Sequence, residues 1–225
     1  MAAPTLTASA AVVSAEWGDT SAYSGDPSGN MTISYGGGDI SSGENIGIYH
    51  LIYGNGSGTL VECLSPQLPT DYGFLNYTVV SVTDGSVAGL GAVNSLPFTS
   101  ASLLAAAQIF DTYAGTVTTQ QQGWGLAAAI YSAMNPGLTV GISSPAVQTA
   151  YNTYSQGYSG DLHPSVVLLV PYPYGPYPAG EPGAGQILLV PASAVPEPAT
   201  VVAGGLGLLL CGLRARRGAS RGRTA

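Results

Sequence analysis

The sequence has 225 residues, and only 8% of them are charged, whereas soluble domains usually have about 25%. Lysine is absent, all five arginines lie between Arg214 and Arg223, and all twelve acidic residues lie between Glu16 and Glu197. A body that carries only negative charge repels a phosphate backbone, because nucleic-acid binding needs basic groups that neutralise the phosphates. We therefore expect no nucleic-acid partner.

The N-terminal residues give weak structural signals. Residues 1–15 contain a modest apolar run that ends in Val-Ser-Ala, small residues typical of a leader-peptide cleavage site, but no basic group precedes the run. We interpret residues 1–28 as an N-terminal segment, the remnant of an export signal whose true start lies upstream. The alternative is that this segment is already part of the mature protein. The folded domain is then expected at 29–192.

Strand patterns follow. Alternation of apolar and polar residues predicts strands at 31–35 and 46–53. An Asn-Gly pair at 55–56 predicts a tight turn, so that 59–64 returns as the second strand of a hairpin. The β-branched run at 77–82 predicts a further strand.

The pattern changes after residue 97. Alanine-rich stretches with apolar residues at helical spacing predict helices at 100–114 and 118–134, and a third helix is expected at 146–158. Strands return at 166–170 and 186–190.

This order of elements predicts an α+β fold. We expect an antiparallel β lobe with a helical insertion at about 100–158, returning strands, and a single short C-terminal transmembrane helix. The last part, 193–225, is expected to form a separate tail.

The tail carries the clearest signal. Residues 199–213 are uncharged and mostly apolar, and basic residues follow at once. The run is short against the ~20 residues of a full helical span, although flanking residues bring it close to that length. Arginines directly after an apolar run fix that end on the cytoplasmic side, so the body would lie outside. The alternative is a buried core helix that ends in a solvated basic segment.

The tail resembles the PEP-CTERM sorting signal. The sequence order that carries the resemblance is Pro196-Glu197-Pro198, the Gly/Leu-rich run, and then the basic stop at Arg214, Arg216 and Arg217. The resemblance implies export in a bacterium, membrane anchoring, and cleavage near the Pro-Glu-Pro motif by an exosortase-type membrane protease. It implies nothing about what the body does.

The middle of the chain loosely resembles thioester-type surface domains. In these domains a strand with a cysteine is followed by a helix, and then by a second helix that begins with a glutamine motif and a tryptophan. Here the order is Cys63, the helix at 100–114, then Gln120 to Trp124. The resemblance implies a bond between the Cys63 sulfur and the Gln120 side chain, with Trp124 as apolar cover.

Two departures from the thioester pattern are visible. Glu62 precedes Cys63 where an aromatic residue or leucine is usual, and Gln122-Gly123 stands where Ala-Ile is usual. Gln121 and Gln122 are alternative partners for the thiol. The structural alternative is that Cys63 is a small buried side chain, that Trp124 anchors the core, and that the glutamines are a solvated helix start.

Other chemistry has little support in the sequence. His50 and His163 are far apart and lack a carboxylate at ligand spacing, so we expect no metal site and no cofactor. No catalytic motif is visible, and we do not expect an enzyme.

The sequence therefore indicates a structural or adhesive protein of the cell surface or extracellular matrix. A thioester would attach it covalently to an amine-bearing target. The alternative is a non-covalent module for surface polysaccharide or another matrix component, in which Tyr172, Tyr174 and Tyr177 stack on sugar rings.

Overall fold

The computed structural model describes residues 12–17, 23–39, 46–64, 75–83, 99–156, 165–171 and 187–196. The chain divides into two compact units, Met1–Val195 and Pro196–Ala225.

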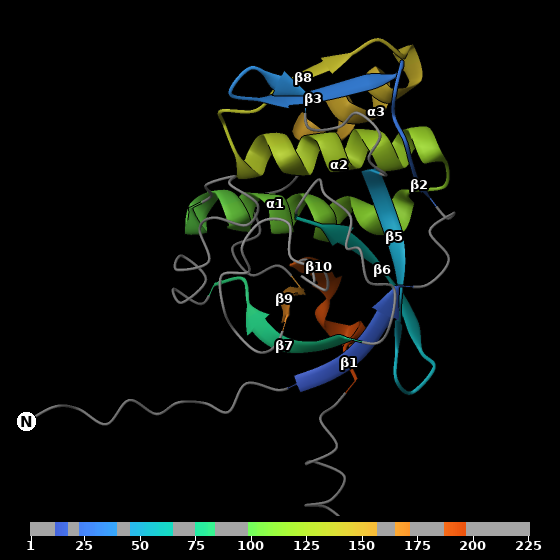
Figure 1. Ribbon diagram of the computed structural model, residues 1–225, viewed down its shortest axis with the longest axis vertical. Helices are drawn as coiled ribbons and strands as arrows, with labels where there is room; N and C mark the ends of the chain where they lie inside the picture. The colour runs from blue at the N-terminus through green and yellow to red at the C-terminus, as the bar shows by residue number, and fades with distance from the viewer. Residues whose placement is uncertain are drawn as a thin grey trace, which may run out of the picture. The chain divides into compact units, whose positions relative to one another are not determined.

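Within the described residues, seven strands form one antiparallel sheet that closes into a barrel-like ring (Figure 1). The strands in sheet order are β1 (Val12–Trp17), β7 (Leu75–Ser81), β9 (Val166–Pro171), β10 (Leu188–Pro191), β6 (Gly58–Cys63), β5 (Ile46–Tyr53) and β2 (Tyr23–Gly25). The ring closes because β1 pairs with both β7 and β5. Strand β2 pairs with 46–48 of β5, and β1 pairs with 51–53 of the same strand.

The inside of the ring is filled by side chains that alternate along the strands. Every strand of the sheet except β2 contributes to this buried cluster, which consists of Val13, Ala15, Tyr49, Leu51, Tyr53, Val61, Cys63, Tyr77, Leu169, Leu188 and Val190. Because successive side chains of a strand point to opposite faces, the residues between them face outward. A small closed sheet packs its own interior in this way.

In the part of the chain that the structure describes, three α-helices lie outside the ring. They are α1 (Ser100–Tyr113), followed by a short 3₁₀ turn η2 (Ala114–Thr116), then α2 (Gln120–Met134) and α3 (Pro145–Gln156). Helix α1 begins with a capping box: the Thr99 hydroxyl accepts from the Ser102 amide, and the Ser102 hydroxyl accepts from the Thr99 amide.

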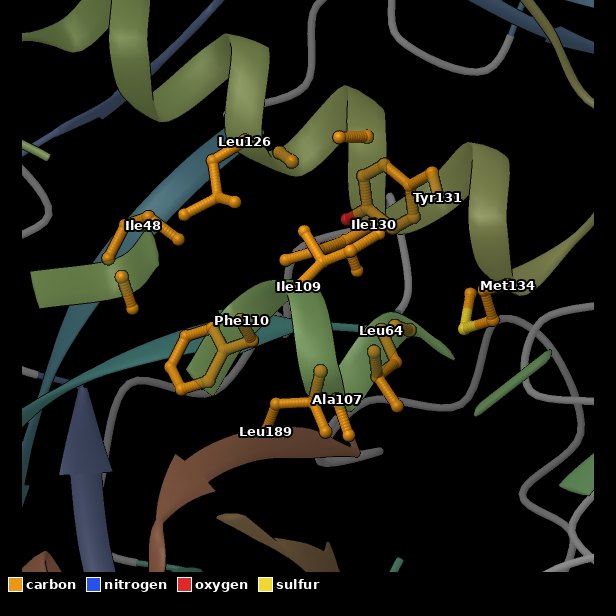
Figure 2. Close-up of a cluster of buried hydrophobic side chains, with 14 of the residues drawn as sticks. Ile48, Leu64, Ala107, Ile109, Phe110, Leu126, Ile130, Tyr131, Met134 and Leu189 are labelled. Atoms are coloured by element: carbon orange, nitrogen blue, oxygen red, sulfur yellow. The ribbon is translucent and has the colours of Figure 1, made fainter. Parts of the chain in front are cut away.

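The helices and the outer face of the sheet share a second, larger core (Figure 2). The labelled members of this cluster are Ile48, Leu64, Ala107, Ile109, Phe110, Leu126, Ile130, Tyr131, Met134 and Leu189. On its other side α2 packs closely against α3, because Gly125 has no side chain where a Cβ atom would meet Ala150.

A second, three-stranded sheet has the order β4 (Gly38–Asp39), β3 (Met31–Tyr35) and β8 (Thr139–Ile142). Its central strand β3 pairs along its length with β8, from Met31 opposite Ile142 to Ser34 opposite Thr139. Figure 1 shows this sheet on the far side of α2 from the ring. A last 3₁₀ turn, η3 (Ala192–Ala194), follows β10.

The α+β class, the antiparallel lobe and the helical insertion are confirmed, with α3 ending at Gln156. The hairpin at the Asn-Gly pair is also confirmed. Strands β1 and β2 fall in 1–28 yet belong to the sheet, and the compact unit continues to Val195 instead of ending at 192. In strand β1, Val13 and Ala15 point inward, whereas Ser14 and Glu16 point outward. The same run of small residues is also compatible with a cleavage site.

No helix in the described ranges is both long and apolar enough to cross a bilayer. The transmembrane helix expected at 199–213 lies outside the described residues, as do Glu197, Pro198 and the basic stop.

Candidate functional site at helix α2 and strand β6

The beginning of α2 is fixed by its own polar residues. Thr119 caps the helix by accepting from the Gln122 amide at 3.2 Å. The Gln122 side chain reaches back, and its Oε1 accepts from the Thr118 amide at 2.8 Å and from the Thr118 hydroxyl at 3.0 Å. These bonds satisfy backbone groups that a helix start otherwise leaves unpaired. Gln122 is therefore a capping residue.

Gln120 and Trp124 share one face of α2, as their spacing predicts, and that face meets strand β2. Gln120 Nε2 donates to the Ser24 carbonyl oxygen at 2.7 Å, and Trp124 Nε1 donates to the Gly25 carbonyl oxygen at 3.0 Å. Both acceptors are backbone groups of the short strand at the end of the sheet. The two side chains therefore fasten this edge strand to the helix, which also protects the edge from pairing with another chain.

Glycines allow the same strand to lie unusually close to its neighbours. A Cβ atom on Gly123 of α2 would collide with the Tyr23 carbonyl oxygen, and so would a Cβ atom on Gly47 of β5. Gly47 also has a φ of 131°, a backbone conformation that glycine tolerates and other residues rarely adopt. The Tyr23 carbonyl is thus enclosed between two backbones. We call Gln120, Gly123, Trp124 and the strand they hold the β2 clamp.

Cys63 lies in the other core. It is 2% exposed and belongs to the cluster inside the ring, opposite Leu188 of β10. Its carbonyl oxygen accepts a hydrogen bond of 2.8 Å from the hydroxyl of Tyr131 on α2. The Gln120 amide is hydrogen-bonded to β2 and the Cys63 side chain is packed inside the ring. The structure does not bring these two candidate partners together, while Gln121 is exposed and Gln122 caps the helix.

Three tyrosines accompany Cys63 inside the ring. The hydroxyls of Tyr53 and Tyr77 have no hydrogen-bond partner among the described residues. Burial raises the pKa of Tyr53 to about 12, and burial followed by the neighbouring Cys63 raises that of Tyr77 further. These phenols therefore stay neutral at physiological pH, and the interior of the ring carries no charge from them.

Glu62 is the residue whose position the sequence reasoning missed. It is 0% exposed, and neither carboxyl oxygen accepts a hydrogen bond within the described residues. It stands opposite Ile48 and Leu189 in the sheet, both members of the core beneath the helices. Desolvation by burial raises the pKa of Glu62 well above its usual value, and the nearby Tyr131 hydroxyl opposes this rise.

A pattern in the sequence marks the position of Glu62. Leu60, Glu62 and Leu64 alternate with Val61 and Cys63, so a two-residue period puts the glutamate on the same side of the strand as the two leucines. The residue directly before Cys63 is thus a buried acid.

The remaining candidates stay apart. His50 is exposed on β5, and no group of three or more His, Cys, Asp or Glu that could hold a metal occurs among the described residues. Of the sorting motif only Pro196 is described, and it is half-buried. His163, Tyr172, Tyr174 and Tyr177 lie outside the described residues.

Comparison of the chain with known protein families, with curated proteins and with solved structures finds no match.

The β2 clamp predicts a difference between two neighbouring glutamines. Gln120→Ala removes the donor to the Ser24 carbonyl and is expected to lower the free energy of unfolding by about 1 kcal/mol. Gln121→Ala, at an exposed position one residue along, is the matched control and is expected to change it by less than about 0.5 kcal/mol. Urea unfolding followed by tryptophan fluorescence measures both, and equal effects would contradict the clamp.

The location of Cys63 predicts its chemical state. In a Cys211→Ser variant, which leaves Cys63 as the single thiol, we expect the intact mass of the sequence with no loss of ammonia. A thiol reagent should label the protein quickly only after unfolding, since the side chain is buried. A mass lower by one ammonia, with a methylamine adduct after treatment, would instead establish the thioester.

Proposed function

We propose that this chain is an exported bacterial surface or extracellular-matrix protein, structural or adhesive in role, that is delivered by its C-terminal sorting tail. The observation that carries the proposal is the separation of charge. Every acidic residue lies before the apolar run at 199–213, and every arginine lies after it. That order anchors the arginines on the cytoplasmic side and leaves an anionic body outside. The protease that recognises the Pro196-Glu197-Pro198 motif is then a membrane partner of exosortase type.

The layout of the domain supports removal of the tail. Strand β10, which lies between β9 and β6, ends at Pro191, and the compact unit ends at Val195. A cut near the Pro-Glu-Pro motif therefore removes no strand of the sheet. The body would keep its fold after it is released from the membrane.

The geometry around Cys63 favours attachment without a covalent bond. Gln120, the best candidate to acylate the thiol, is engaged with β2 instead. The exposed face of α3 carries uncharged polar side chains, Thr149, Asn152 and Thr153, whose threonine hydroxyls donate to carbonyls of their own helix and keep lone pairs to accept from a ligand. Such groups suit a neutral polysaccharide or another uncharged matrix component. The three tyrosines at 172, 174 and 177 remain the candidates for stacking on sugar rings.

The sorting tail is tested by changing its motif in a bacterium that has an exosortase. The wild-type chain is expected outside the inner membrane without its C-terminal arginines. The combined change Pro196→Ala, Glu197→Ala and Pro198→Ala should leave the chain membrane-bound with its tail intact. Pro136→Ala, at an exposed turn of the body, is the control and should be sorted like the wild type. Identical fractionation and identical C-termini for all three chains would contradict the proposal.

A further inference from the structure

No lysine or arginine occurs among the described residues, so none of them pairs there with the buried carboxyl of Glu62. Lysine and arginine are absent from the chain before Arg214, so no described or undescribed segment of the body supplies either. The two histidines are the remaining basic side chains. His50 is exposed on β5, two residues from the position opposite Glu62, and His163 lies outside the described residues.

The neighbours of Glu62 do not supply a charge either. Within the described residues, β5 and β10 place Ile48 and Leu189 opposite it, and α2 contributes the Tyr131 hydroxyl. From the next position along β6, Cys63 points into the ring. Asp111 is the acid of α1, but it is exposed and accepts from the Ser165 amide. Tyr49 of β5 belongs to the cluster inside the ring. It is one of the neighbours that, after burial, raise the pKa of Tyr131.

An isolated carboxylate in such surroundings is very costly, and a buried acid ordinarily keeps its proton instead. We propose that Glu62 is held as the neutral acid in the folded domain and acts as a proton-dependent lock between α2 and the sheet. The lock works through Tyr131. While Glu62 is neutral, the Tyr131 hydroxyl donates to the Cys63 carbonyl and ties α2 to β6. When Glu62 loses its proton to solvent, the carboxylate competes for the Tyr131 proton and weakens that tie.

The direction of the pH effect follows from the raised pKa. The folded state binds the Glu62 proton more tightly than the unfolded state, whose pKa is near the ordinary 4.5. The stabilisation is complete below about pH 4.5 and is lost as the pH rises through the folded pKa. The folding equilibrium constant should therefore fall by up to about tenfold per pH unit between about pH 4.5 and the folded pKa of Glu62, and should level off above that pKa. Alkaline conditions therefore weaken the attachment of α2 to the sheet, and mildly acidic conditions preserve it.

The test compares the full-length wild type with Glu62→Gln, which keeps the shape of the side chain and cannot ionise. Urea unfolding is measured from pH 4 to pH 9, where the acidic surface affects both chains alike. We expect the folding constant of the wild type to fall more steeply with pH, so that the ratio of the two constants changes by at least tenfold across the range. Parallel profiles would overturn the lock.

A second measurement, infrared spectroscopy, can be made on the wild type and does not depend on whether a variant folds. A neutral carboxylic acid has an infrared carbonyl band separate from those of carboxylates, and the solvated acids are ionised at pH 7. The wild type is expected to show this band at pH 7 and to lose it when unfolded. If Glu62→Gln does not fold, Glu62→Leu serves as the control, because leucine continues the pattern of Leu60 and Leu64. This variant should lack the band. A folded wild type without the band at pH 7 would show an ionised Glu62 and would overturn the inference. Neither measurement depends on how the tail is sorted.

Discussion

The absence of lysine and arginine before Arg214 is the constraint on which the rest of this structure depends. Lysine and arginine ion pairs cannot contribute to the body, so shape and uncharged hydrogen bonds must specify the fold. Glycines provide much of that shape. Because Gly123 and Gly47 have no side chain, the Tyr23 carbonyl can lie between their backbones. Because Gly125 has none, α3 can pack closely against α2. The same charge distribution gives the tail its orientation in a membrane, so the fold and the proposed sorting have a common origin in composition.

Helix α2 is where these uncharged contacts meet. Its first turns hold β2 through Gln120 and Trp124, and its later turns hold β6 through Tyr131. Between these anchors the helix buries a continuous apolar face against α1 and the ring. Glu62 lies beneath it, and no lysine or arginine occurs among the described residues to neutralise it. The helix layer is therefore attached most firmly when that group is neutral.

Much of the fold could be predicted because strand and helix periods are local properties of the sequence. The strands at 31–35 and 46–53 and the two long helices are found where expected. Short strands such as β2 and β8 are stabilised by partners far along the chain, which no local pattern reveals. Cys63, Gln120 and Trp124 could be named from the sequence as candidates, but their contacts and the burial of Glu62 could not. Gln120 and Trp124 share a face as their spacing requires, yet sequence spacing does not say that the face meets β2.

The most direct measurement of the central claim is the C-terminus of the protein recovered from its native location, determined by mass spectrometry of the intact chain. The account predicts a chain found outside the inner membrane that ends close to Pro196-Glu197-Pro198, retains β10 and lacks every arginine. A chain that is recovered dissolved in the cell interior and extends to Ala225 with all five arginines would contradict it.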